Sequence, residues 1–150
     1  MFVGYYLSTV GWIQLCADEQ TLLSCTFVEG KGIENRNNII NETMKQLKEY
    51  FNGTRMTFDV PLKLLGTEFQ IKVWKALIKI PYGKTCSYAD IASAIGNSKA
   101  CRAVGNANNK NKFAIIIPCH RVIGKNKKMV GYAAGIDKKE YLYAFEALNC

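Results

Sequence analysis

The sequence predicts an α+β fold in two parts. We expect a small N-terminal lobe of antiparallel sheet plus one helix over residues 1–60, and a C-terminal helical lobe with a winged-helix-like helix-turn-helix over residues 61–150. Strand-forming runs lie mainly in the first 28 residues, and helical periodicity dominates the rest. Between them, residues 58–62 are extended because a residue before proline, here Val60 before Pro61, is kept out of the α region.

The N-terminal lobe begins with runs of aromatic and branched residues. Residues 2–6, 12–16 and 22–28 each favour a strand, and residues 17–20 form a polar turn, so an antiparallel meander follows. Residues 34–51 carry apolar side chains at helical spacing and stop at Asn52-Gly53, which predicts a helix with one core-facing side.

The C-terminal lobe opens with a capping box, in which Thr67 caps a helix and Gln70 reaches back to it. This helix carries Trp74 on its inward side as a core residue. A short helix then covers residues 87–95, and Gly96 supplies a left-handed turn. We expect Asn97 or Ser98 to cap a second short helix that runs to about Asn108.

These two short helices and their glycine turn fit two interpretations. With basic residues on the second helix, they are typical of a DNA-binding helix-turn-helix. Small side chains would let that helix approach a partner closely, and Gly105 lowers helix stability, which suggests that the approach matters. An ordinary helical hairpin with a basic face fits this stretch equally well by itself.

Three consecutive isoleucines, residues 115–117, predict a strand that ends at Pro118. Cys119 and His120, the single histidine of the chain, follow in a turn, where chemistry is often placed. A buried structural cysteine beside a hydrogen-bonded histidine is the ordinary interpretation, and a nucleophile with its base is the alternative. Adjacent side chains point apart in regular structure, so cooperation requires a tight turn or a bridging water.

Two further elements follow the Cys-His turn. Residues 125–128 (Lys-Asn-Lys-Lys) predict a basic hairpin tip, and residues 131–135 predict flexible backbone. Asp137 and Glu140 have the spacing of a second capping box, which would open a C-terminal helix.

The net charge of +8 is concentrated in one segment. Residues 91–136 contain eight basic residues and no acidic ones, which leaves 12 basic and 12 acidic residues in the rest of the chain. An acid-free basic segment around the Cys-His turn predicts a surface for a polyanion, above all nucleic acid.

Cysteine spacing and hydropathy exclude several classes of protein. The six cysteines include no Cys-x-x-Cys pair, and a single histidine cannot complete a common zinc pattern, so we expect no metal site. A disulfide between Cys16 and Cys25 across the hairpin stays an open alternative to free thiols. The sequence has neither a long apolar run nor a basic leader, so we expect a cytoplasmic protein without a membrane span.

Residues 117–122 (Ile-Pro-Cys-His-Arg-Val) resemble the active-site signature of the O6-alkylguanine-DNA alkyltransferases, the methylated-DNA–protein-cysteine methyltransferase family. The resemblance is strong over residues 61–150, whereas residues 1–60 match only the general outline. Further motifs stand at family-like spacings: Gly66-Thr67-Glu68-Phe69-Gln70, Val73-Trp74, Ile80-Pro81-Tyr82-Gly83, Ser87-Tyr88, Arg102-Ala103-Val104-Gly105, Asn111 and Glu146.

This resemblance implies a single-turnover suicide transferase that repairs DNA without a cofactor. Cys119 would accept the alkyl group of O6-alkylguanine irreversibly, after His120 takes the thiol proton through a water. Glu146 would hold His120 in the required tautomer. Tyr88 would donate to the departing guanine, and Asn111 would brace the Pro-Cys-His turn.

The resemblance also implies how DNA is bound. A duplex base cannot reach a buried thiol, so the nucleotide would be flipped into the protein. Residues 61–150 would then be the DNA-binding and alkyl-acceptor domain of a protein that acts as a monomer on double-stranded DNA. The guanine pocket would include Val122, Tyr132 and Ala133, and the second short helix would lie in the minor groove. Its DNA contacts would be Ser98, Lys99, Arg102, Ala103 and Gly105, with Arg102 filling the vacated stack.

Other assignments remain open from the sequence. Arg121 fits either a structural ion pair or a DNA contact. A DNA damage sensor would lack the reactive cysteine, a Cys-His hydrolase would need an oxyanion site, and a plain DNA-binding regulator would form no covalent product. The zinc-ligand histidines that some family members carry in the N-terminal lobe are absent.

Two positions of the alkyl pocket depart from the family pattern and predict substrate preference. The family often has serine at the place of Ala133 and glycine at the place of Ala134. The extra methyl group of Ala134 should slow the transfer of bulky groups, so we expect benzyl to react more slowly than methyl and Ala134→Gly to narrow the gap. The measurement is the transfer rate from each O6-substituted guanine. Equal rates for both groups, unchanged by Ala134→Gly, would contradict it.

Overall fold

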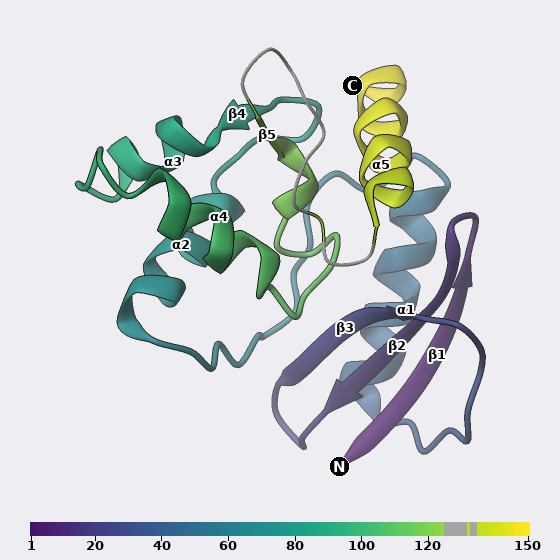
Figure 1. Ribbon diagram of the computed structural model, residues 1–150. Helices are drawn as coiled ribbons and strands as arrows, with labels where there is room; N and C mark the ends of the chain where they lie inside the picture. The colour runs from purple at the N-terminus through teal and green to yellow at the C-terminus, as the bar shows by residue number, and fades with distance from the viewer. Residues whose placement is uncertain (125–131, 133–134) are drawn as a thin grey trace. The chain divides into compact units, whose positions relative to one another are not determined.

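The computed structural model describes residues 1–124, 132 and 135–150. The chain divides into two compact units, Met1–Leu64 and Leu65–Cys150. The elements of both are labelled in Figure 1. Within the described ranges, no helix is both long and apolar enough to cross a membrane.

The first unit is the predicted antiparallel meander with one helix. Strands β1 (Phe2–Ser8), β2 (Gly11–Ala17) and β3 (Leu22–Val28) pair in that order. Helix α1 (Asn38–Phe51) packs on one face of this sheet (Figure 1). The core between them contains fully buried side chains of Ile13, Leu15, Leu22, Ile40, Leu47 and Tyr50.

Helix α1 starts later than the apolar pattern predicts. Asn37 caps it by accepting a hydrogen bond from the amide of Ile40 at 3.0 Å. The preceding Asn35 is held in an extended conformation because its amide and carbonyl both pair with Val3. Sheet pairing therefore takes residues that the helical pattern alone assigned to the helix.

The cysteines of the first unit do not form the disulfide that the sequence left open. Cys25 pairs across the sheet with Leu15, whereas Cys16 pairs with Ser24. Leu15 and Cys16 are adjacent on β2, so their side chains point to opposite faces of the sheet. Cys25, opposite Leu15, is therefore buried, whereas Cys16 is partly exposed. All six cysteines of the chain are free thiols.

The second unit begins with helix α2 (Glu68–Ile78), whose predicted capping box is confirmed. Thr67 Oγ1 accepts from the amide of Gln70 at 3.1 Å, and Gln70 Oε1 accepts from the amide of Thr67 at 2.9 Å. Trp74 is buried, as expected, and its Nε1 donates to the carbonyl of Ala107 at 2.9 Å. This bond joins α2 to α4 (Cys101–Asn109).

Helix α3 (Tyr88–Ala94) and α4 form the predicted pair of short helices. Ser87 caps α3 in a box with Asp90, and Gly96 adopts the expected positive φ of 80°. Neither Asn97 nor Ser98 caps α4, which is a correction. The backbone makes one more turn, with the Ala100 amide bonded to the Asn97 carbonyl, so the helix begins at Cys101 without a side-chain cap.

The isoleucine run is not a strand, so this prediction was wrong. Residues 114–117 form tight turns instead, and Ile115 has a φ of 71°, which is rare for a β-branched residue. The amides of Ile116 and Ile117 bond to Ala114 and Phe113 within the same loop. All three isoleucines are buried, so the β-branched run reflects burial and not sheet pairing.

The chain after Pro118 forms a short 3₁₀ helix, η1 (Cys119–Arg121), and strand β5 (Val122–Ile123), which pairs in parallel with β4 (Cys86–Ser87). Helix α5 (Ile136–Asn149) follows. It begins after Gly135 without a side-chain cap, so Asp137 lies inside its first turn and the second capping box was a wrong prediction. The hairpin tip expected at 125–128 and the flexible positions 131, 133 and 134 lie outside the described residues.

Candidate active site

Cys119 lies at the start of η1, where a tight turn meets a short strand. Its side chain is buried, and its amide bonds to the carbonyl of Ile117 at 2.7 Å. Three residues later, Val122 enters strand β5 opposite Cys86. The sulfur-bearing residue is therefore held on both sides, which keeps its position fixed.

Asn111 closes the turn in front of Cys119 with one side-chain amide. Its Nδ2 donates to the carbonyl of Ile117 at 2.9 Å and to that of Phe113 at 3.3 Å, and its Oδ1 accepts from the Phe113 amide at 2.9 Å. The same Nδ2 lies 3.2 Å from Cys119 Sγ. Asn111 thus both braces the loop and places a hydrogen-bond donor on the sulfur, which favours the thiolate.

His120 is paired with a buried carboxylate from the C-terminal helix. Its Nε2 lies 2.6 Å from Glu146 Oε2, and both side chains are almost completely inaccessible to solvent. Glu146 comes from α5, 26 residues further along the chain. The single histidine and the late glutamate therefore meet in space.

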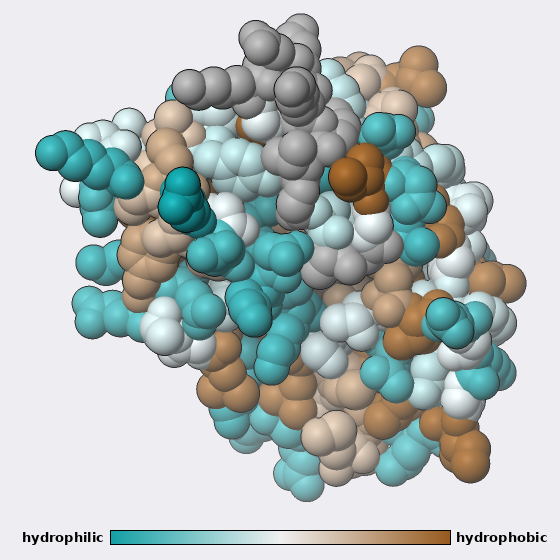
Figure 2. Space-filling model, in the orientation of Figure 1, coloured by the Kyte–Doolittle hydropathy of each residue, from teal (hydrophilic) through white to brown (hydrophobic). Residues whose placement is uncertain are grey.

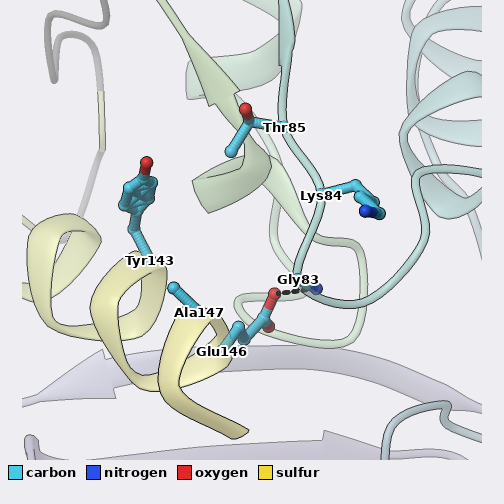
Figure 3. Close-up of a pocket in the computed structure, with 6 residues that line it drawn as sticks. All are labelled: Gly83, Lys84, Thr85, Tyr143, Glu146 and Ala147. Atoms are coloured by element: carbon cyan, nitrogen blue, oxygen red, sulfur yellow. Dashed lines mark hydrogen bonds between the residues drawn. The ribbon is translucent and has the colours of Figure 1, made fainter. Parts of the chain in front are cut away.

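Arg121 forms a buried structural ion pair with Glu146. Of the two interpretations that the sequence left open, the ion pair is therefore the one observed, and not the DNA contact. Its Nε donates to Glu146 Oε1 at 2.7 Å, its Nη2 to Oε2 at 3.1 Å, and its Nη1 to the carbonyl of Ile80 at 2.6 Å. The Gly83 amide adds a longer bond of 3.4 Å to Glu146 Oε1, drawn in Figure 3 beside a small pocket. A buried bidentate pair of this kind fixes the carboxylate and leaves Arg121 unavailable to DNA.

These contacts set the charges of the site. Burial raises the pKa of Glu146, but the hydrogen bonds and charges of His120 and Arg121 outweigh it and hold that pKa well below the usual range. Burial lowers the pKa of His120, and it raises the pKa of Cys119 against the opposing effect of Asn111. The carboxylate is therefore ionised at rest, while the thiol and the imidazole are neutral.

The pairing with Glu146 also assigns the histidine tautomer. An ionised carboxylate only accepts, so Nε2 carries the proton and Nδ1 has the free lone pair. Nδ1 is buried and has no hydrogen-bond partner among the described residues. It is therefore the atom that can accept a proton.

Two more ionisable side chains reach the same site. Tyr88 is the first residue of α3, and its pKa is raised, first by burial and then by the negative charge that Cys119 carries as a thiolate. Lys139 of α5 places Nζ 3.5 Å from the Tyr88 hydroxyl and 5.8 Å from the centre of its ring. Tyr132 is also buried, and its side chain acts to lower the pKa of Cys119.

The structure thus brings together Cys119, His120, Glu146, Tyr88 and Asn111, the residues expected to be catalytic. Val122 and Tyr132 are buried in the same unit, and Ala133 lies outside the described residues. The sequence reasoning missed Lys139, which lies between the two residues of the expected capping box, Asp137 and Glu140. A signal was present, because Lys139, Leu142 and Glu146 are spaced to share one face of α5, and all three are buried.

The residues expected to contact DNA lie just before α4 and along it. Ser98, Lys99, Arg102 and Ala103 are exposed, whereas Val104, Ala107 and Asn108 form the buried side of α4. Figure 2 shows hydrophilic side chains gathered over α4. A Cβ at Gly105 would lie no closer than 3.9 Å to the Tyr88 ring, so nothing inside the described protein demands glycine there.

Comparisons with known proteins match this arrangement over the whole chain. Residues 68–148 match the family model of the 6-O-methylguanine DNA methyltransferase DNA binding domain, and residues 1–64 match that of its ribonuclease-like domain. The chain belongs to the 6-O-methylguanine DNA methyltransferase family. The first 64 residues are therefore a family domain as well, although the sequence resemblance there covered only the general outline.

Individual members of this methyltransferase family are similar to the chain in sequence and in structure. The methylated-DNA–protein-cysteine methyltransferase of Methanosarcina acetivorans is 48% identical over 97% of this chain and 98% of that protein. The crystal structure of the Mycobacterium tuberculosis O6-methylguanine methyltransferase superposes with a TM-score of 0.91 at 39% identity, covering 99% of this chain and 94% of that one. The Mycobacterium tuberculosis OGT in complex with DNA gives 0.90 at 41% identity, covering 97% and 92%.

The depressed pKa of Glu146 predicts how stability depends on pH in this family member. A carboxyl whose pKa falls on folding stabilises the protein above its unfolded pKa of about 4.3, and that contribution is lost as the pH falls below it. Glu146→Gln should therefore cost about 3–5 kcal/mol at neutral pH, because Arg121 keeps a buried unpaired charge. The difference from the unmodified protein should shrink below about pH 4.

Urea unfolding across the pH range measures this difference. Glu140→Gln is the matched control, since Glu140 is exposed on the same helix and should change the unfolding free energy by about 0.5 kcal/mol or less. A difference for Glu146→Gln that stays constant down to about pH 2 would show that Glu146 is not held ionised.

Proposed function

We propose that this protein repairs DNA by transferring the alkyl group of O6-alkylguanine directly and irreversibly to Cys119, once per molecule. The observation that carries the proposal is the buried Cys119 sulfur, with the Asn111 amide 3.2 Å away and the adjacent His120 bound to Glu146. A thiol beside an oriented base is the arrangement of an activated nucleophile. Membership of the methyltransferase family supports the assignment of its substrate.

The reaction begins with loss of the thiol proton. His120 Nδ1 takes the proton of Cys119 through a bridging water, and the resulting imidazolium is stabilised by Glu146 across the 2.6 Å contact. Glu146 itself stays ionised, because Arg121 donates two hydrogen bonds to it. The carboxylate therefore orients and stabilises the histidine but does not receive its proton.

The thiolate then attacks the alkyl carbon in an SN2-like displacement. The S–C bond forms as the C–O6 bond breaks, and the bonding electron pair leaves with guanine. Tyr88 donates its hydroxyl proton to the departing base, and the phenolate recovers a proton from the imidazolium by way of solvent. In the balance, the thiol proton ends on guanine and Cys119 carries a stable thioether, so each molecule acts once.

The burial of Cys119 requires the damaged base to enter the protein. The sulfur-bearing residue is 5% exposed, so O6 of a stacked guanine cannot reach it and the nucleotide is flipped out of the duplex. The carbonyls of Cys119 and Val122 and the amide of Ala133 read the guanine edge, with Tyr132 beside them. Because the group at position 133 belongs to the backbone, recognition should not depend on whether that residue is serine or alanine.

The exposed side of α4 supplies the DNA contacts. Its small residues, with Ala103 and Gly105 among them, let the helix backbone enter the minor groove, and Ser98 and Lys99 contact the backbone of the duplex. Arg102 fills the space that the flipped nucleotide leaves. We therefore assign DNA binding and alkyl acceptance to the domain expected over residues 61–150, most of which is the second unit, Leu65–Cys150.

The partner of this domain is double-stranded DNA carrying O6-alkylguanine. One molecule holds one acceptor for one lesion, so a monomer is sufficient. The free thiols of all six cysteines fit the reducing conditions of the cytoplasm.

The decisive prediction is a covalent product. After mixing with a duplex that contains one O6-methylguanine, intact-protein mass spectrometry should show one added methyl group per molecule, and peptide mapping should place it on Cys119. Cys119→Ser should take none, whereas Cys16→Ser, the matched control in the first unit, should react normally. Tight lesion binding without an adduct would indicate a damage sensor, and neither adduct nor binding would overturn the function altogether.

Arg102 should matter for base extrusion and not for chemistry. Unstacking costs a few kcal/mol, so Arg102→Ala should lower the transfer rate from duplex DNA by about tenfold or more, yet leave transfer from the free O6-alkylguanine base unchanged. The control Lys110→Ala removes an exposed charge just after α4 and should mainly change the salt dependence. Equal losses on both substrates in Arg102→Ala would assign Arg102 to the chemical step.

A further inference from the structure

Asn108 is a buried residue whose side-chain amide makes no hydrogen bond in the described protein. It is 2% exposed, and neither Nδ2 nor Oδ1 has a partner among residues 1–124, 132 and 135–150. Buried amides are nearly always paired, because an unpaired donor or acceptor has lost its bonds to water without replacement. The two other asparagines of α4, Asn106 and Asn109, are exposed and meet no such cost.

The packing of α4 does not explain this amide. Val104 and Ala107, the other buried residues of the helix, are apolar and almost completely inaccessible to solvent. A leucine, which branches at the same carbon as asparagine, would suit such surroundings better because it leaves no polar atom unpaired. Asn108 therefore calls for a reason outside the fold.

The position of Asn108 along α4 places it between two groups of the site. Residues three apart on a helix share a face, with about 5–6 Å between their Cβ atoms. Three residues earlier, a Cβ at Gly105 would lie 3.9 Å from the Tyr88 ring. Three residues later, the Asn111 amide donates to the Asn108 carbonyl at 3.4 Å, and Asn111 Nδ2 lies 3.2 Å from Cys119 Sγ. Asn108 thus lies between the donor expected for the leaving base and the brace of the acceptor sulfur.

O6-alkylguanine has the groups that would pair with this amide. Its ring nitrogens accept hydrogen bonds and its exocyclic amino group donates them, so it offers both kinds of partner that a primary amide needs. When the C–O6 bond breaks, negative charge spreads from O6 over the ring nitrogens, which then become stronger acceptors. Asn111 cannot serve them, because its Nδ2 already contacts two carbonyls and the sulfur. Asn108 keeps its donor unused.

We propose that Asn108 is a further catalytic residue, whose Nδ2 donates a hydrogen bond to a ring nitrogen of the extruded guanine and stabilises the base as it leaves. The inference rests on the proposed function and deepens it. The bond is weaker toward the neutral alkylated base and strengthens as the C–O6 electron pair passes to guanine, so it lowers the barrier to transfer. No proton moves through Asn108, and the proton balance of the reaction is unchanged.

Asn108→Leu separates this role from packing, because it should improve stability and impair transfer at once. Without DNA, the melting temperature should rise by about 3 °C or more, since an unpaired buried amide is removed. With saturating duplex that contains one O6-methylguanine, the single-turnover rate of Cys119 methylation should fall about tenfold or more. The control Asn109→Leu changes an exposed neighbour and should keep the melting temperature within about 1 °C and the rate within about twofold.

The acidity of the leaving base gives a readout that a packing defect would not change. 8-Azaguanine has the size of guanine but is more acidic, so it needs less stabilisation to leave. The loss of rate in Asn108→Leu should therefore be smaller with O6-methyl-8-azaguanine in the duplex than with O6-methylguanine. An equal loss on both substrates would overturn the catalytic role. If Asn108→Leu does not fold, Asn108→Met removes the same amide with a more adaptable side chain.

The outcomes keep this inference separate from the function on which it rests. If the unmodified protein takes the methyl group and the Asn108 variant reacts equally fast, the inference fails and the repair function stands. A fall in melting temperature in both Asn108→Leu and Asn108→Met would show that the amide is already paired in the protein without DNA, which also overturns the inference. If the unmodified protein takes no methyl group, the repair function fails and the inference fails with it.

Discussion

The second unit depends on one buried carboxylate. Glu146 of α5 accepts hydrogen bonds from His120 and twice from Arg121, and Arg121 in turn reaches the Ile80 carbonyl just beyond α2. Desolvating these charges costs several kcal/mol each, so the network is stable only when every donor has its acceptor. The same bonds that fix α5 against η1 therefore also hold the histidine in its reactive tautomer. The hydrogen bonds of Glu146 thus serve both the stability of the second unit and the chemistry of the site.

Asn111 holds the backbone of the loop before Cys119 in place, as Glu146 holds the side chains of His120 and Arg121. The loop before Cys119 contains a β-branched residue, Ile115, at a φ of 71°, a conformation that costs on the order of 1–3 kcal/mol. The Asn111 amide satisfies two carbonyls and one amide of this loop and still reaches the sulfur. Hydrogen bonds and the burial of the isoleucines offset the strain, and the loop delivers Cys119 into a protected position that a regular strand end would expose.

The sequence predicts best those features that are set by neighbours in the chain. The three strands and the Thr67 box follow from local alternation and capping, and they were placed within two residues or better. The isoleucine run was misread because buried loops and buried strands select the same side chains. The bonds that distinguish them, within the loop and from Asn111, cannot be seen in the sequence. The cap at Asp137 failed because its spacing does not reveal that the helix already starts at Ile136. Cys119 and His120 stand out in the sequence, whereas the roles of Glu146 and Tyr88 came from the family resemblance.

The resting charges of the site make sense for a protein that reacts once. A permanent thiolate would be consumed by any electrophile that reached it, and the molecule would be lost without repairing DNA. Burial keeps Cys119 as a thiol and His120 neutral, so the resting sulfur stays unreactive until its proton is removed. The protein thus keeps its acceptor in a protected form until the reaction begins.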